Sequence, residues 1–188
     1  MFFTKNHQLG QKLKNFSFFN TKFVIKGMDE LFQSLSKEYD IIIVTSNYEA
    51  FVKQFLEKHN ILKYVTKIFS EPSTITEDGK FEIGSIPKDW GGSCICEVNK
   101  TAGPQQLICK KLVLQYHIKS IDSTTKYEKV IYIGDDFNDL CVSLSLGSND
   151  LIFAREGYKL DSLLKQYSST AQAKIISWKN GLDILLHV

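Results

Sequence analysis

Apolar residues recur along this chain with two different spacings, and segments of the two kinds alternate. Short apolar runs, such as IIIV at 41–44 and VIYI at 130–133, are typical of strands covered on both faces. Other segments repeat apolar residues three or four positions apart, which predicts helices. The alternation indicates an α/β domain with a mainly parallel sheet flanked by helices. In chain order we expect a helix at 28–36, a strand at 40–45 with a helix directly after it, a strand at 67–70, a hairpin turning at 77–79, a helix at 104–117, a strand at 130–133, a helix within 136–146, a strand at 151–154, a helix at 158–167, a strand at 173–177 and a helix from 181.

The run VIYIGDDFND joins one of these strands to three carboxylates. Gly134 permits a sharp turn, and Asp135, Asp136 and Asp139 follow it within five positions. Ligands of open α/β sheets bind outside the carboxyl ends of the strands, so these acids are expected to line a crevice. Carboxylates suit Mg²⁺, which takes one or two of them together with water and phosphate oxygens. The simpler alternative is a polar turn in which Asp136 caps the next helix.

Two other segments bring phosphate-binding chemistry to the same edge. The strand at 40–45 delivers Thr45 and Ser46 to the N-terminus of the following helix, and a hydroxyl there suits a phosphate oxygen. The alternative is a plain helix cap, since Ser46 and Glu49 match the capping-box pattern. Lys110 could supply a cation between phosphate and the carboxylates, although a helix lysine is more often simply solvated. Together the three segments favour a phosphate site more than any one of them alone.

The composition is that of an ordinary soluble domain. The 188 residues fit one domain, and the formal net charge of +2 argues against nucleic acid or an anionic membrane as partner. No apolar run reaches membrane-spanning length and no secretory signal is visible, so we expect a cytoplasmic protein. The cysteines are expected to be free thiols, with Cys109 and Cys141 in the core. A zinc site from Cys94, Cys96 and Cys109 is a weaker alternative, because it lacks the usual paired spacing.

Three features follow one another along the chain: a hydroxyl after an apolar strand, a lysine, and the sequence GDxxND. In this order they resemble motifs two, three and four of the haloacid dehalogenase-like phosphohydrolases. The similarity is closest to their phosphoethanolamine/phosphocholine phosphatase and pyridoxal-phosphate phosphatase branch. It spans about 23–187, apart from an insertion around 98–106, and divides the chain into an atypical N-terminal segment, 1–22, and a phosphatase core, 23–188. The segments that carry it are IKGMDELF, TSNYEAFVKQFLEKHNILKYVTKIFSEPS, TEDGKFEI, LICKKLVL, IYIGDDFNDLCVS, FAREGYKL and ISWKNGLDILLH.

This resemblance implies a Rossmann-like core and a Mg²⁺-dependent phosphomonoester hydrolase that acts on a small phosphorylated metabolite through an aspartyl-phosphate intermediate. Thr45 and Lys110 would be the catalytic residues that hold the phosphoryl group, and Ser46 and Asn47 would join them in binding substrate. The acidic turn would supply the metal ligands, which are Asp135 and Asp139 with Asp136 and Asn138 as further candidates. Two departures from the branch are Asp136, where a small residue is usual, and C-I-C at 94–96 in place of C-x-x-C.

The largest departure concerns the family's first motif, D-x-D-x-T, whose first Asp is the nucleophile and whose second acts as general acid and base. No D-x-D occurs in these 188 residues, and the first 22 contain neither Asp nor Glu. In this fold the strand carrying that motif lies centrally, between the strands that carry Thr45 and Asp135, and most of the cap that follows it would be missing too. We therefore expect the sheet to close up, a segment such as 16–19 to fill the place, or the chain to be incomplete.

Three hypotheses about activity follow. The chain is a shortened form of a true phosphatase, or a pseudophosphatase that binds a phosphorylated ligand or a protein partner without turnover, or a degenerate product without a stable fold. In each case the chain as written is expected to lack the nucleophile, so that it is truncated or catalytically impaired.

Overall fold

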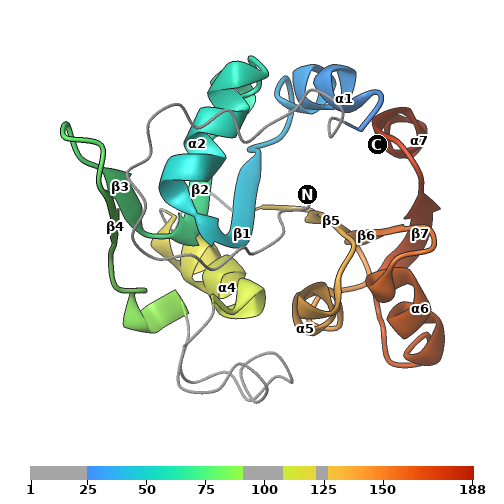
Figure 1. Cartoon of the computed structure of the whole chain (residues 1–188). Coiled ribbons are helices and arrows are strands. Elements are labelled where there is room, and N and C mark those ends of the chain that lie inside the picture. The colour runs from blue at the N-terminus through green and yellow to red at the C-terminus, as the bar shows by residue number, and fades with distance from the viewer. Residues whose placement is uncertain (1–24, 91–107, 122–126) are drawn as a thin grey trace.

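The computed structural model describes residues 25–90, 108–121 and 127–188. These residues form a mixed α/β fold (Figure 1). The helices are α1 (Met28–Leu35), α2 (Glu49–Lys58), α4 (Lys110–Ser120), α5 (Leu140–Ser143), α6 (Lys159–Gln166) and α7 (Gly181–Leu185). The strands are β1 (Ile42–Tyr48), β2 (Lys67–Glu71), β3 (Ser73–Ile75), β4 (Phe81–Ile83), β5 (Ile131–Gly134), β6 (Leu151–Arg155) and β7 (Lys174–Trp178).

The strands of the main layer form two parallel half-sheets. One half-sheet pairs β1 with β2, and the other has the order β5-β6-β7. A separate antiparallel hairpin of β3 and β4 turns through Gly79, whose φ of +79° is open to glycine and strained for other residues. Parallel strands with helical crossovers confirm the fold class that the sequence predicts, a Rossmann-like core with helices on both faces.

Two helices cover both half-sheets, one on each face. On one face α1 sends Met28 and Leu31 into a core cluster with Phe153 of β6, while its Phe32 packs with Val52 of α2. On the other face α4 behaves in the same way. Its Val113 packs with Phe69 of β2, and its Leu114 packs against a cluster that contains Ile152 of β6. Alternate residues of β6 thus point to opposite faces, as the strand period of two requires.

The inner edges of the half-sheets, on β1 and β5, have no strand partner within the described residues. In Figure 1, β5 lies on the side of β1 that faces away from β2. Residues 151–154 of β6, which is paired on both sides, are buried, whereas residues 42–44 of β1 and 131–133 of β5 are only half-buried. The described sheet has therefore not closed up by pairing β1 with β5. The segment 1–22 and its candidate filler 16–19 lie outside the described residues.

Several predicted boundaries need correction. β1 continues through Tyr48 with an irregular register after Val44, so the residues expected at the start of a helix belong to the strand end. No Ser46–Glu49 capping box forms, because α2 begins at Glu49 with Tyr48 as its N-cap. The hydroxyl of Ser73 accepts a hydrogen bond from the N–H of Ala50 instead, at 3.1 Å. A residue 23 positions further along the chain thus provides the cap.

Two predicted helices also differ in extent. The helix expected at 104–117 begins at Lys110 in the described part of the chain and extends to Ser120, while 104–107 are not described. The helix expected within 136–146 is divided into a 3₁₀ turn, Phe137–Asp139, and the four-residue α5. The carboxylates of Asp136 and Asp139 accept hydrogen bonds from backbone N–H groups of this turn, which favours the 3₁₀ conformation.

Candidate phosphate and metal site

The centre of the candidate site is the buried carboxylate of Asp139. One of its oxygens accepts hydrogen bonds from the backbone N–H groups of Asp135 and Asp136, both at 3.0 Å. The other accepts from the Tyr132 hydroxyl and from Lys110, both at 2.5 Å. Burial acts to raise the pKa of Asp139, but the charge of Lys110 and these hydrogen bonds hold it below its ordinary value. Asp139 is therefore an anion whose two oxygens both have protein partners.

Glycine at position 134 makes this arrangement possible. A Cβ added to Gly134 would stand 2.8 Å from Cγ of Asp139 and 2.9 Å from its Oδ2, far inside ordinary contact distance. The carboxylate of Asp139 thus lies directly against the backbone where β5 ends. The glycine that the sequence suggested for a sharp turn is required here for close approach as well.

Lys110 brings a cation to the carboxyl end of β5 from another element. It is the first residue of α4, and its Nζ contacts Asp139 and donates to Oδ1 of Asn138 at 3.2 Å. The two side chains of the ion pair are only 13% and 2% exposed, so the pair is largely shielded from solvent. A lysine ammonium has three N–H donors, and its contacts with described residues use two of them. One donor therefore remains for a ligand.

Asp135 presents the open acceptor of the site. Asp135 is 5% exposed, and its Oδ2 is buried without a hydrogen-bond partner among the described residues. Burial raises the pKa of Asp135, the charge of Asp139 adds to this effect, and Lys110 opposes it. A buried carboxylate oxygen without a partner costs free energy that a cation can recover. The position fits a hard metal ion such as Mg²⁺, which needs few protein carboxylates.

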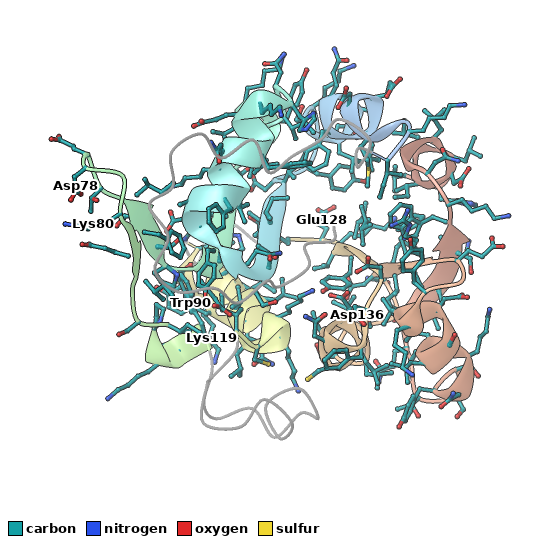
Figure 2. All side chains as sticks on the ribbon, viewed as in Figure 1. Asp78, Lys80, Trp90, Lys119, Glu128 and Asp136 are labelled. Carbon is teal, nitrogen blue, oxygen red and sulfur yellow. The ribbon has the colours of Figure 1, made fainter. Side chains whose placement is uncertain are left out.

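Asp136 and Asn138 have different surroundings from Asp135. Asp136 caps the 3₁₀ turn, since its Oδ1 accepts from the N–H of Phe137 at 2.7 Å, and it forms a capping box with Asp139. Figure 2 shows it beside α5. Asp136 thus makes the capping contact that the simpler alternative predicts, and a metal-binding role for it stays a prediction. Asn138 contacts the ammonium of Lys110 through its amide oxygen.

Thr45 lies at the end of the neighbouring half-sheet, on β1. Its residue is 8% exposed, and its hydroxyl accepts from the backbone N–H of Asn47 at 3.2 Å and from the Asn47 side chain at 2.9 Å. The two bonds leave the hydroxyl hydrogen of Thr45 available to a phosphate oxygen. Ser46 is half-buried in the same irregular stretch. The structure places Thr45, Ser46 and Asn47 together, while Lys110, Asn138 and Asp139 form a second group in direct contact.

Tyr132 also belongs to the site, although the sequence motifs do not point to it. Its hydroxyl donates to Asp139, and burial together with the Asp139 charge raises its pKa well above the ordinary value. Tyr132 therefore stays protonated and serves as a donor. Tyr132 lies in the apolar run VIYI, two residues before Gly134. Because a tyrosine hydroxyl in a buried strand usually needs a hydrogen-bond partner, this position could have predicted a contact with the acidic turn.

The sequence predicts a Mg²⁺ site and, as a weaker alternative, a zinc site. The described residues contain no cluster of three or more His, Cys, Asp or Glu side chains that could hold a metal ion. A Mg²⁺ site built on one or two carboxylates remains a prediction.

The cysteines have different environments. Cys94 and Cys96 lie outside the described residues, Cys109 is buried as the N-cap of α4, and Cys141 is half-buried. In the described part of the chain, no helix has both the length and the apolar character of a membrane span.

The parallel half-sheets and the lysine–acid turn at their carboxyl edge define a haloacid dehalogenase-like core, and comparison with known proteins identifies its family. The chain belongs to the family described as "Putative Phosphatase", whose sequence model matches residues 3–188. This confirms the resemblance that the sequence motifs indicated.

Individual relatives agree with this assignment. The chain is 28% identical over 165 residues to the phosphoethanolamine/phosphocholine phosphatase of Gallus gallus, covering 84% of this chain and 58% of that protein. It is 27% identical over 169 residues to the pyridoxal phosphate phosphatase PHOSPHO2 of Homo sapiens and 29% identical over 169 residues to that of Mus musculus, covering in each case 86% of this chain and 66% of the relative. The chain thus spans less than two thirds of the length of these relatives.

Proposed function

We propose that the carboxyl edge of the half-sheets binds the phosphate group of a small phosphomonoester, together with Mg²⁺, as the core of a phosphatase of the phosphocholine, phosphoethanolamine or pyridoxal-phosphate type. The observation that carries this proposal is the contact of Lys110 with Asp139, which holds an ammonium in the same turn as Asp135, where its charge acts to lower the pKa of the Asp135 carboxyl. A cation and a carboxylate fixed side by side suit a phosphate and its metal ion, because each ligand compensates one of the charges.

The residues divide the work by their partners. Lys110 donates to a phosphate oxygen through its remaining N–H, and Thr45 donates through its hydroxyl. Asp135 would hold Mg²⁺, whereas Asp139 positions Lys110, because its own oxygens are bound to protein. Bound there, Mg²⁺ would neutralise charge on the phosphate oxygens.

Catalysis needs a further group that these 188 residues do not supply. The sequence has no D-x-D, and the resemblance places the nucleophile on such a motif. The second candidate function is therefore a pseudophosphatase, a protein that binds a phosphorylated ligand without hydrolysing it. We expect the purified 188-residue chain to bind phosphomonoesters and to release no inorganic phosphate from them.

Binding of inorganic phosphate in the presence of Mg²⁺, measured by isothermal titration calorimetry, tests the site. Lys110→Met should weaken binding about 10- to 100-fold, the equivalent of one hydrogen bond to a charged group. Lys111→Met is the matched control, since Lys111 lies next in the same helix and has no contact with the described residues of the site. Lys110→Met also leaves Asp139 buried without its cation, so Thr45→Val provides a second variant that leaves no charge unpaired.

Two results would count against the proposal. Phosphate affinity that survives both Lys110→Met and Thr45→Val would show that phosphate binds elsewhere. Release of phosphate from phosphocholine by the wild-type chain, abolished by Asp135→Asn, would show that the chain is an active enzyme and would refute the pseudophosphatase function.

A further inference from the structure

The hydroxyl of Tyr132 and the ammonium of Lys110 meet on the same oxygen of Asp139. Both donate to Oδ1, each at 2.5 Å, while Oδ2 accepts from the backbone N–H groups of Asp135 and Asp136. An ionised carboxylate offers about four acceptor positions, so these four donors fill all of them. Asp139 therefore has no acceptor position left for a second hydrogen bond from Lys110.

Tyr132 and Lys110 reach this oxygen from different elements, and core packing holds both elements. Tyr132 is the second residue of β5, where it pairs in register with Ile152 of β6. Its ring and the side chain of Leu114 in α4 pack against the same core cluster, which contains Ile152. Leu114 lies four residues after Lys110, so the two residues share one face of α4. The hydroxyl and the ammonium are therefore held beside Asp139 by the packing of β5 and α4.

Removing the Tyr132 hydroxyl would open one acceptor position on Oδ1 of Asp139. That position is buried, since the Asp139 side chain is 2% exposed, and a buried acceptor without a donor costs free energy. Lys110 has a donor that can fill it. Its Nζ already lies against Oδ1, and its contacts with Asp139 and Asn138 use two of its three N–H groups. The third N–H would then turn to Asp139 and be lost to a ligand.

We propose that Tyr132 is a positioning residue for phosphate binding: its hydroxyl occupies Oδ1 of Asp139 and so leaves the third N–H of Lys110 to the ligand. This inference rests on the proposed function, which assigns that N–H to a phosphate oxygen. The alternative is a purely structural role, in which the hydroxyl only satisfies a buried phenol and steadies the turn. The two roles differ in their dependence on Lys110, because only the positioning role acts through its ammonium.

The affinity of the full 188-residue chain for inorganic phosphate, measured by NMR titration with Mg²⁺ present, separates the two roles. Tyr132→Phe should weaken binding about 3- to 10-fold, the equivalent of one ordinary hydrogen bond. The same loss should recur in the Thr45→Val background, since Thr45 donates to phosphate independently. It should vanish in the Lys110→Met background, because no N–H is left to divert. Tyr64→Phe is the matched control and should bind like wild type, since Tyr64 is also half-buried but packs against a cluster without site residues.

Unchanged phosphate affinity in Tyr132→Phe, or an equal loss in all three backgrounds, would overturn the proposal and leave the proposed function intact. The NMR signal of the Lys110 ammonium, identified by its absence from Lys110→Arg, is a second readout that needs neither phosphate nor a double variant. In phosphate-free solution Tyr132→Phe should shift this signal and slow the exchange of its protons with water, whereas Tyr64→Phe should change neither. If phosphate does not bind wild type, the proposed function fails and this signal decides: a shift in Tyr132→Phe still supports the diversion of Lys110, and an unchanged signal overturns it.

Discussion

Replacing Gly134 by alanine tests whether the close approach of Asp139 to the backbone holds the site together. The added Cβ would stand 2.8 to 2.9 Å from three atoms of the Asp139 side chain. The carboxylate cannot retreat without stretching its bonds to the N–H groups of Asp135 and Asp136 and to Lys110. The substitution should therefore disturb the whole turn.

The magnitude follows from two contributions. Overpacking in a close-packed region costs about 1 to 3 kcal/mol, and one weakened hydrogen bond adds about 1 kcal/mol. Urea unfolding of Gly134→Ala should thus show a loss of about 2 to 4 kcal/mol. Gly147→Ala is the matched control, because the nearest atom to its Cβ is an oxygen of Asp150 at 3.7 Å, an ordinary contact. That variant should change the free energy of unfolding by about 1 kcal/mol or less, in the stabilising direction.

A double variant assigns the cause. In the Asp139→Ala background the clashing atoms beyond Cβ are gone, so the cost of Gly134→Ala should be smaller by about 0.5 to 3 kcal/mol. A free energy of unfolding for Gly134→Ala within 0.5 kcal/mol of wild type would refute the reasoning, as would an equal cost in both backgrounds.

Three other predictions concern parts of the fold outside the phosphate site. Burial lowers the pKa of His117, the charge of Lys67 adds to this effect, and the charge of Asp40 opposes it. The unfolded chain therefore binds more protons, so the free energy of unfolding should fall as pH drops below the ordinary His pKa of about 6.5. Urea titrations at several pH values should show a smaller fall for His117→Gln. Gly181→Ala would place a Cβ 2.1 Å from the carbonyl oxygen of Gly27, so it should lower the free energy of unfolding by about 1 to 3 kcal/mol; an unchanged thermal midpoint would contradict this. Ser73→Ala removes the cap of α2 and should cost about 0.5 to 2 kcal/mol in urea unfolding, whereas a neutral result would show that water replaces the hydroxyl.

Local patterns in the sequence predicted most of the elements, because each depends on neighbouring residues. The apolar run at 130–133 and the spacing around 159–166 correspond to β5 and α6. The acidic turn and Lys110 were also expected to meet, since parallel strands end at one edge of the sheet. These inferences needed only the repeat of the side chains and the direction of the strands.

Features that depend on distant partners could not be predicted in the same way. The cap of α2 comes from Ser73, and nothing near Ser46 shows that a residue on a later hairpin would compete for its role. The hydrogen bond from Tyr132 to Asp139 likewise depends on the turn folding back against the end of its own strand, which the sequence pattern does not predict. Helix starts and hydroxyl roles are decided by tertiary contacts of this kind, which periodicity does not encode.

The division of labour between Asp135 and Asp139 shows how such contacts change a functional assignment. Both are acids in one short motif, and the sequence assigns both to the metal. In the structure, Asp139 has a protein partner on each oxygen, whereas within the described part of the chain Asp135 keeps a buried oxygen without one. If both bind Mg²⁺, Asp139 must first release one of these partners, such as Lys110 or Tyr132. If only Asp135 binds it, then Asp135→Asn should weaken the Mg²⁺ dependence of phosphate binding, and Tyr132→Phe should leave that dependence in place. A loss of Mg²⁺ dependence in Tyr132→Phe equal to that in Asp135→Asn would contradict the assignment of Asp139 to positioning.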